Sequence, residues 1–285
     1  MQLHRISEHV YWSIPDSRTD RPVLGAIVGE RGTLMVDAGN SPAHAEEFLA
    51  ALEEAGVSAP RYVVLTHWHW DHVFGTSLLD VPTFAHQKTK RIVTEMAQLD
   101  WRDEALDRRV EEGREIEFCR DYIKVELTDE QRADLVIRPP DIAFTDRLEI
   151  ELGGVTCHIA HVGGDHAADS SIVYVPQDKI LFLGDCLGVS IYDGPRYYTT
   201  RNLFSLLDRL LAYDIDSYLA GHDPDPWPRT EMEKDTETFK TIGQVVETLA
   251  FDRAAVVAAL EERFGTPLDE FQGYCVDAFL AGQDR

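Results

Sequence analysis

The feature that most constrains the fold is the run at residues 67–72, His-Trp-His-Trp-Asp-His, which holds three imidazoles and one carboxylate. Directly before it stands the stretch 62–65, whose aromatic and β-branched side chains predict a strand. Neutral imidazole and carboxylate are ligands that divalent metals such as zinc prefer. Buried without partners, these polar groups would be costly. The run therefore predicts a metal site at the end of a strand.

One loop cannot complete such a site, so other strand ends are expected to contribute ligands. Three later positions carry suitable side chains in suitable places: His166, Asp185 and His222. His166 lies in a loop of small residues between predicted strands, and the other two follow short apolar stretches. Sites in open α/β sheets gather at strand ends of this kind.

The remaining pattern alternates between strands and helices. Strands are predicted at residues 10–14, 23–28, 33–36, 62–65, 81–85, 142–144, 148–152, 155–160, 171–175 and 180–183. A helix is predicted from Pro42 to about Ala55, because Ser41 is a good N-cap, proline suits the first helical position and Gly56 can end the helix. This order predicts the α/β fold class.

Two helical segments are expected to accompany these strands within a single domain spanning residues 1–285. The segment 87–138 is charge-rich and reads as a helical insertion, and residues 230–285 read as a C-terminal helical segment. Two interpretations of the insertion stay open. It is either a solvated group of helices packed on the scaffold or a cap over the active site.

The composition of the chain excludes some classes of binding partner and indicates where the protein is located. The formal net charge of −24 repels phosphate backbones at long range, so neither nucleic acid nor an anionic membrane is expected as a partner. No stretch approaches the roughly 20 apolar residues that span a bilayer, and the N-terminus lacks the apolar core of a secretory signal. A cytoplasmic location is therefore expected. The four cysteines are scattered, which predicts reduced thiols and no thiolate metal site.

The ordered set of the histidine run, the loop histidine, the Gly-Asp at 184–185 and the Gly-His at 221–222 resembles the metallo-β-lactamase superfamily. The resemblance extends over most of residues 10–225. It implies a four-layer αββα sandwich of two mixed β-sheets, with a dinuclear metal site at one edge of the sheets. The residues it assigns are His67, His69 and His166 to the first ion, Asp71, His72 and His222 to the second, and Asp185 to both. Two divalent ions are expected, with zinc favoured and iron or manganese as alternatives.

Some positions depart from the family pattern. Asp165, Asp169 and Asp223 stand where glycine is commoner in the family. His158 and His161 compete with His166 for the role of third histidine. His166 is preferred because its distance to the following strand–turn–strand unit fits the family.

The resemblance also implies the chemistry, which is hydrolysis by attack of a hydroxide that bridges the two metals. Asp71 would bind metal and also take or pass a proton, which makes it the candidate catalytic residue. True β-lactamases of this fold usually lack the bridging aspartate, so we expect a hydrolase of a small ester, lactone or thioester. The alternatives are a small-molecule phosphodiesterase and a mononuclear-iron persulfide dioxygenase of the same fold. A small-molecule substrate is expected in every case, and the oligomeric state stays open.

Several residues near the predicted ligands have more than one interpretation. Asp37 ends a predicted strand and either orients a histidine or only shapes a turn. Of Trp68 and Trp70, one is expected to enter the core and the other to line the pocket. The candidates for contact with substrate follow Asp185 in the chain; they are Tyr192, Arg196, Tyr197, Tyr198 and Arg201.

Overall fold

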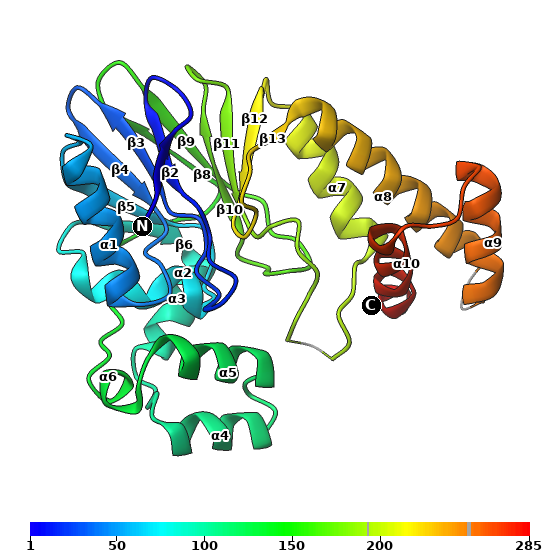
Figure 1. Cartoon of the computed structure of the whole chain (residues 1–285), viewed down its shortest axis with the longest axis horizontal. Coiled ribbons are helices and arrows are strands. Elements are labelled where there is room, and N and C mark those ends of the chain that lie inside the picture. The colour runs from blue at the N-terminus through cyan, green and yellow to red at the C-terminus, as the bar shows by residue number, and fades with distance from the viewer. Residues whose placement is uncertain (193, 250–251) are drawn as a thin grey trace.

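The computed structural model describes residues 1–192, 194–249 and 252–285, and within these residues the strands form two mixed sheets that face each other (Figure 1). The strands of the first sheet, in spatial order, are β1 (Leu3–Arg5), β2 (Val10–Ser13), β3 (Gly25–Gly29), β4 (Gly32–Val36), β5 (Pro60–Leu65), β6 (Thr83–His86) and β7 (Ile142–Phe144). Strands β1 to β4 pair antiparallel, and β4 to β7 pair parallel.

The second sheet runs in the order β13-β12-β11-β10-β9-β8. Its strands are β8 (Arg147–Glu151), β9 (Thr156–His161), β10 (Ser171–Val175), β11 (Ile180–Gly184), β12 (Ser217–Ala220) and β13 (Trp227–Pro228). Only β11 and β12 pair parallel, and α7 (Thr200–Leu211) connects them. The sequence pattern missed β1 and β13 because these short strands, Leu-His-Arg and Trp-Pro, carry no run of apolar or β-branched side chains.

Strand alternation divides the core into layers. Val64 of β5 and Phe182 of β11 point between the sheets and share one buried cluster. Their neighbours Val63 and Leu65 point to the outer face of the first sheet, and Leu183 points to the outer face of the second. Because successive side chains on a strand point to opposite faces, each central strand serves two cores.

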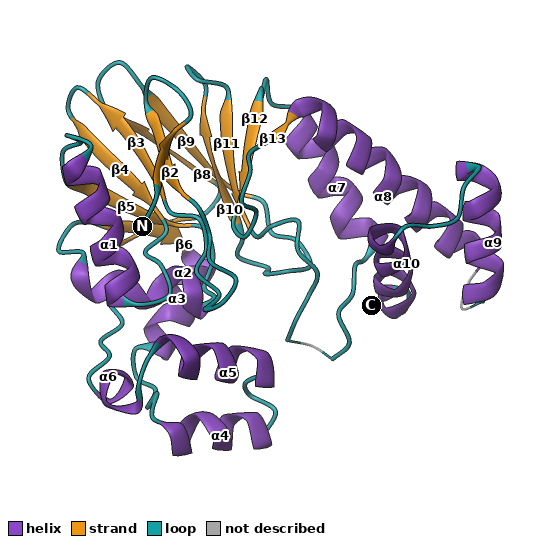
Figure 2. Ribbon diagram, viewed as in Figure 1, coloured by secondary structure: helices purple, strands orange, loops and turns teal. Residues whose placement is uncertain are grey.

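Helices cover both outer faces (Figure 2). On the first sheet lies α1 (Pro42–Glu54), whose N-cap Ser41 accepts a hydrogen bond from the backbone N–H of His44 at 3.0 Å, as the sequence predicts. On the second sheet lie α7 and α8 (Arg229–Leu249), and α9 (Arg253–Phe264) and α10 (Glu270–Gly282) pack against α8. The result is a four-layer αββα sandwich, and the expected fold class is confirmed.

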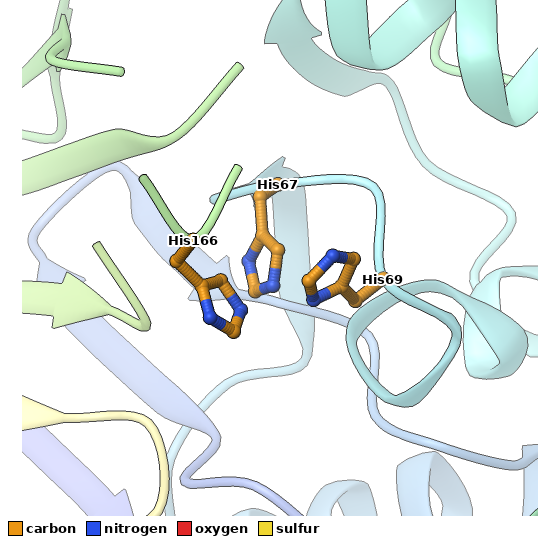
Figure 3. Close-up of side chains that lie close together, drawn as sticks. All are labelled: His67, His69 and His166. Carbon is orange, nitrogen blue, oxygen red and sulfur yellow. The ribbon is translucent and has the colours of Figure 1, made fainter. Parts of the chain in front are cut away.

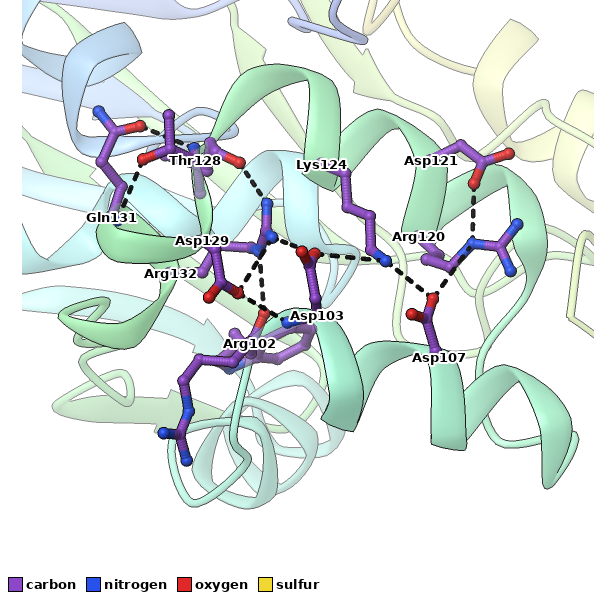
Figure 4. Close-up of polar contacts among 12 residues, drawn as sticks. Arg102, Asp103, Asp107, Arg120, Asp121, Lys124, Thr128, Asp129, Gln131 and Arg132 are labelled. Atoms are coloured by element: carbon purple, nitrogen blue, oxygen red, sulfur yellow. Dashed lines mark hydrogen bonds and ion pairs between the residues drawn. The ribbon is translucent and has the colours of Figure 1, made fainter.

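The segment between β6 and β7 contains α3 (Gln87–Met96), α4 (Asp103–Glu111), α5 (Glu117–Glu126) and α6 (Asp129–Ala133). Buried Leu106 and Ile123 anchor α4 and α5 to the cluster under the first sheet. Charged side chains link these helices on the other side, where Lys124 lies 2.8 Å from Asp107 and Arg132 pairs with Asp103 (Figure 4). The charge-rich pattern of this segment is therefore one of ion pairs between short helices.

No helix in the described residues combines the length and the apolar character that a membrane span requires.

Two short helices follow β5 after a loop of four residues: α2 (Trp70–Val73) and a 3₁₀ helix (Phe74–Leu78). The histidine run therefore begins in a loop and ends in a helical turn.

Candidate metal centre

Asp37 positions the histidine run. It follows β4, and β4 pairs with β5, so its carboxylate lies beside the loop that leaves β5. The carboxylate accepts hydrogen bonds from the backbone N–H of Thr66 at 2.7 Å and from its hydroxyl at 2.8 Å. Oδ2 of Asp37 also lies 2.8 Å from Nδ1 of His72. Of the two interpretations of Asp37, the structure favours the one in which it orients a histidine, here the candidate ligand His72.

The first group of candidate ligands consists of His67, His69 and His166, whose rings converge from two loops (Figure 3). The loop after β5 supplies the first two, and the loop between β9 and β10 supplies the third. Thr66 contacts Nδ1 of His67 at 3.1 Å, and Nδ1 of His166 lies 3.1 Å from the carbonyl oxygen of Val189. Among the described residues, no hydrogen-bond partner reaches Nε2 of any of the three rings.

The second group consists of Asp71, His72, Asp185 and His222. Oδ2 of Asp71 lies 3.1 Å from Nε2 of His72 and 3.1 Å from Nε2 of His222. These residues come from α2, from the end of β11 and from the end of β12. His222 is the most exposed, with 35% of its side chain accessible.

Asp185 stands between the two groups. Its Oδ2 lies 3.9 Å from Nε2 of His67 and 3.5 Å from Nε2 of His166 in the first group. The same oxygen lies 3.5 Å from Nε2 of His72 and 3.3 Å from Nε2 of His222 in the second. Oδ1 of Asp185 is buried and has no hydrogen-bond partner among the described residues.

Glycines allow this convergence. A Cβ on Gly221 would lie 1.9 Å from Oδ1 of Asp185. Gly184 has φ +51°, and a Cβ there would lie 2.7 Å from Oγ1 of Thr66. The two sheets are joined at this edge by the backbone hydrogen bond from Ser171 N–H to Thr66 O at 2.8 Å. Side chains at either glycine would push the candidate ligands apart.

The charges in the site suit a cation. Burial lowers the pKa of His67 and of His69 well below the usual range, and neighbouring imidazoles add to this effect, so both rings are neutral at pH 7. Burial opposes the charging of His72 and His222, but the carboxylates of Asp71 and Asp185 outweigh it and raise the pKa of both rings well above the usual range. Burial likewise opposes ionisation of Asp185, but these charged rings outweigh it and hold its pKa well below the usual range. A cation would take the place of the protons on Nε2 of these two rings, because metal binds neutral imidazole and ionised carboxylate.

The donor set and its spacing fit divalent metal ions. Ligand atoms about 2.0–2.1 Å from a tetrahedral ion are separated by about 3.4 Å. The contacts within the site, at 3.1–3.9 Å, cluster around this value. Buried Nε2 atoms without partners, facing carboxylates, are expected where an ion binds.

All seven predicted ligands therefore lie in one place, and the competing histidines do not join them. His161 stacks on His86 with a ring-centroid distance of 3.8 Å, and the ring of His158 lies 6.0 Å from that of Tyr174. Asp20 is a neighbour that the sequence did not reveal. Its Oδ1 lies 3.7 Å from Nδ1 of His222, and burial, followed by the charge of Asp71, raises the pKa of Asp20 to about 7.

The aromatic residues beside the ligands take different positions. The ring of Tyr192 packs against Trp68 and His69, at centroid distances of 4.9 and 5.3 Å, and its hydroxyl lies 3.4 Å from Sγ of Cys119. Trp70 is buried in the core under the first sheet, and it also borders the main cavity described below. The two tryptophans therefore do not divide the core and pocket roles as cleanly as the alternation predicts.

The other candidates for contact with substrate are also dispersed. The Tyr198 hydroxyl donates to Leu187 O at 2.9 Å. Tyr197 packs under Arg285, and Arg201 lies on α7 away from the main cavity. Arg196 and Tyr198 line that cavity.

The main cavity has a volume of about 590 Å³ and opens on the candidate ligands His69, Asp71, His166, Asp185 and His222. Beyond them its walls come from α5, from the stretches 187–191 and 196–198, and from α8 and α10. A volume of this size suits a small organic molecule.

Comparison with known proteins defines the class. The sequence model of the metallo-beta-lactamase superfamily matches residues 21–222, and the chain belongs to this superfamily. The chain is 24% identical over 255 residues to the 2,4-dinitroanisole O-demethylase subunit alpha of a Nocardioides species, with 86% of this chain and 62% of that protein covered. It is 22% identical over 234 residues to the beta-lactamase-like protein 2 homolog of Caenorhabditis elegans, with 77% and 64% covered. The chain thus spans less than two thirds of each relative's length.

Three more similarities come from a curated protein and from solved structures. The chain is 22% identical to the linear primary-alkylsulfatase of a Pseudomonas species, with 73% of this chain and 42% of that protein covered. A metallo-beta-lactamase family protein from Thermus thermophilus superposes with a TM-score of 0.60 at 19% identity, covering 98% and 93% of the two chains. The sec-alkylsulfatase Pisa1 from a Pseudomonas species superposes with a TM-score of 0.65 at 14% identity, covering 98% and 49%. At these identities the structural likeness shows the fold.

Proposed function

We propose that the protein is a dinuclear metal-dependent hydrolase of a small ester, lactone or thioester. The single observation that carries this proposal is the position of Asp185, whose Oδ2 lies 3.3–3.9 Å from Nε2 of four histidines in two groups. One carboxylate shared by two groups of ligands favours two ions close together. The mononuclear-iron alternative gives no role to the second group.

His67, His69 and His166 would hold one ion, and Asp71, His72 and His222 the other, with Asp185 contacting both. Divalent ions at such a centre supply a hydroxide nucleophile near neutral pH and polarise the scissile bond. Zinc suits the His and Asp donors, and iron or manganese would also be accepted.

The chain's own residues would position the reactants. Asp37 holds the ring of His72 through Nδ1, which leaves Nε2 free to act as a ligand. Asp71 lines the cavity and lies 3.1 Å from Nε2 of His222, and we assign to it the transfer of a proton from water to the leaving group. Water oxygen forms a bond to the acyl carbon, the bond to the leaving oxygen or sulfur breaks, and the leaving atom gains a proton. The products are a carboxylic acid and an alcohol or thiol.

The named activities of the relatives widen the panel of substrates worth testing. An alkylsulfatase and a 2,4-dinitroanisole O-demethylase are among them. We keep a small-molecule phosphodiesterase as the alternative reaction, because two ions can also stabilise a phosphoryl transition state. Several expectations from the sequence stay predictions. These are the cytoplasmic location, the lack of nucleic-acid and membrane partners, and the division into one domain with an insertion at 87–138 and a C-terminal segment. The role of that insertion as a cap is also a prediction.

The test is a substrate panel on protein with quantified metal. We expect hydrolysis of esters, lactones or thioesters by protein carrying two ions per chain. His67→Ala and Asp185→Ala should lower kcat/KM at least a hundredfold and reduce the metal content. His158→Ala, a histidine outside both groups, is the matched control and should change neither. Full hydrolysis by the Asp185→Ala variant would overturn the proposal.

A further inference from the structure

The walls of the cavity beyond the metal ligands are mainly apolar. Met232 and Phe239 on α8 form one side, with Phe271 on α10, and Phe118 on α5 belongs to the insertion. Figure 1 shows α8 and α10 on one side of the segment that follows β11, and α4 and α5 on the other. The same cavity thus brings together parts of the chain that are more than 100 residues apart.

Two of these aromatic side chains are exposed although they are large. Phe118 is 37% accessible and Phe271 43%. Phe118 packs on Tyr122 and Phe271 on Phe239, at centroid distances of 4.7 and 5.4 Å, so the two rings extend the apolar wall of the cavity to its solvent-exposed side.

The charged groups on the same walls are mostly acidic. Asp223, Glu231 and Asp235 line the cavity, and within the described part of the chain none of them has a lysine or arginine within 4 Å. Glu231 and Asp235 are one helical turn apart on α8, a like-charge spacing that costs helix stability. Burial, followed by the charge of Glu231, raises the pKa of Asp235.

Fewer basic than acidic side chains line the cavity. Arg196 is the one lysine or arginine lining the cavity among the described residues, and its guanidinium lies 5.8 Å from the ring centroid of Phe118. An anionic group placed far from the metal ligands would meet more negative than positive charge, within a protein of net charge −24.

We propose that the substrate is an uncharged ester or lactone with a large apolar group, and that α8 and α10, together with α5, select this group and disfavour an anion at its far end. The scissile bond would lie at the metal ligands, and the apolar group between Phe118 and the side chains of Met232 and Phe239. This inference rests on the proposed function and names its substrate class. It also assigns specificity to C-terminal helices whose part in the pocket the sequence pattern does not reveal.

The first arm of the test compares substrates on the metal-loaded protein. We expect kcat/KM to rise at least tenfold from p-nitrophenyl acetate to p-nitrophenyl hexanoate, because each buried methylene contributes about 0.8 kcal/mol when fully buried. The mono-p-nitrophenyl ester of adipic acid has the same chain length with a terminal carboxylate. Its kcat/KM should be at least tenfold below that of the hexanoate.

The second arm uses exposed side chains, so that folding is preserved. Phe118→Ser and Phe271→Ser should lower kcat/KM for the hexanoate about fivefold and leave the acetate within twofold. The matched controls are Val125→Ser on α5 and Tyr274→Ser on α10, which are also exposed but do not line the cavity. Glu231→Gln should raise the adipate-to-hexanoate ratio about threefold, whereas Glu237→Gln, on the same helix and outside the cavity, should not.

A binding measurement separates this inference from the reaction. Calorimetry with acetohydroxamate and octanohydroxamate, which chelate metal through the same group, should show at least tenfold tighter binding of the longer compound, reduced in Phe118→Ser. If the metal-loaded protein hydrolyses no ester, lactone or thioester, the proposed function fails. If it hydrolyses them without a preference for chain length or against the carboxylate, or if the control variants behave like the cavity variants, the inference fails alone.

Discussion

Asp37 and His72 lie 2.8 Å apart, carboxylate oxygen to Nδ1, although 35 positions separate them in the chain. The contact fixes which nitrogen of His72 carries the proton, because an ionised carboxylate can only accept. Nε2 is then the nitrogen that would offer its lone pair to an ion, and it faces Asp71 and Asp185. The second group of candidate ligands is therefore oriented by a residue that does not belong to it.

Replacing Asp37 by Asn tests this dependence. The Asn amide can present N–H to Nδ1 of His72, which favours the tautomer protonated at Nε2 and removes a ligand lone pair. We expect the affinity for the second ion to fall 10- to 100-fold, with a smaller effect on the first. Titration with a chromophoric chelator measures both constants. Asp178→Asn, which disturbs the contact of Asp178 with His9 at 3.1 Å, is the control and should leave metal binding unchanged.

Gly221→Ala tests the close approach of the β11 and β12 ends. The added Cβ would lie 1.9 Å from Oδ1 of Asp185, so the carboxylate must move away from both groups of ligands. We expect loss of both ions at metal concentrations that saturate the native protein, measured by elemental analysis. Gly273→Ala in α10 has open space around its Cβ and should bind metal normally, with stability unchanged or raised by about 0.5–1 kcal/mol. Two bound ions in the Gly221 variant would refute the geometric explanation.

Much of this arrangement is predictable from sequence because it depends on local patterns. Strand alternation at residues 62–65 and the histidine spacing after it predict a strand end carrying ligands, and similar strand ends place Asp185 and His222. Asp37 is foreseeable for the same reason, since it ends a strand. The resemblance implies the two mixed sheets of the αββα sandwich, and the structure supplies the order of their strands.

Other parts depend on contacts between distant segments and leave no local signal. Asp20 contacts His222 from a loop 202 positions earlier in the chain. Its backbone has a left-handed φ of 56°, which no sequence motif predicts. Met232 and Phe239 follow the apolar spacing of any buried helix face. The sequence therefore does not distinguish side chains that line the cavity, as these two do, from side chains that only fill the core. Helix packing, which the sequence pattern does not encode, decides between the two.

Tyr192 contacts both the loop after β5, which carries Trp68 and His69, and Cys119 of the insertion. Two variants separate the effect of its hydroxyl from the effect of its ring. Tyr192→Phe removes the hydroxyl, which contacts Sγ of Cys119 at 3.4 Å and hydrogen-bonds with Glu115, and should change the free energy of unfolding by about 1 kcal/mol. Tyr192→Ala also removes the packing against Trp68 and His69 and should cost about 2–3 kcal/mol and weaken the first metal site several-fold. Denaturant unfolding and metal titration measure the two effects. Equal behaviour of the two variants would contradict this role of the ring.

The stacked pair of His86 and His161 predicts a pH dependence of stability. Burial, followed by the neighbouring His161, lowers the pKa of His86 to about 4, below its value of about 6.5 in the unfolded chain. The unfolded state therefore binds more protons between these values, so the stabilisation is complete above pH 6.5 and is lost as the pH falls toward 4.

The effect should amount to about 1–2 kcal/mol after allowance for solvent screening. His86→Asn, which keeps a capping side chain at the start of α3, should lose less stability than the native protein between pH 7.5 and 5. Urea unfolding of chelator-treated protein at both pH values measures the difference. Parallel losses in the two proteins would show that this pair does not titrate as described.

The central claim is that the seven ligands hold two metal ions that share Asp185. Anomalous X-ray scattering from crystals of metal-reconstituted protein tests it most directly. We predict two peaks per chain, one in contact with His67, His69 and His166, the other with Asp71, His72 and His222, and both in contact with Asp185. A single peak after reconstitution with excess zinc, iron or manganese, or peaks that do not contact Asp185, would contradict it.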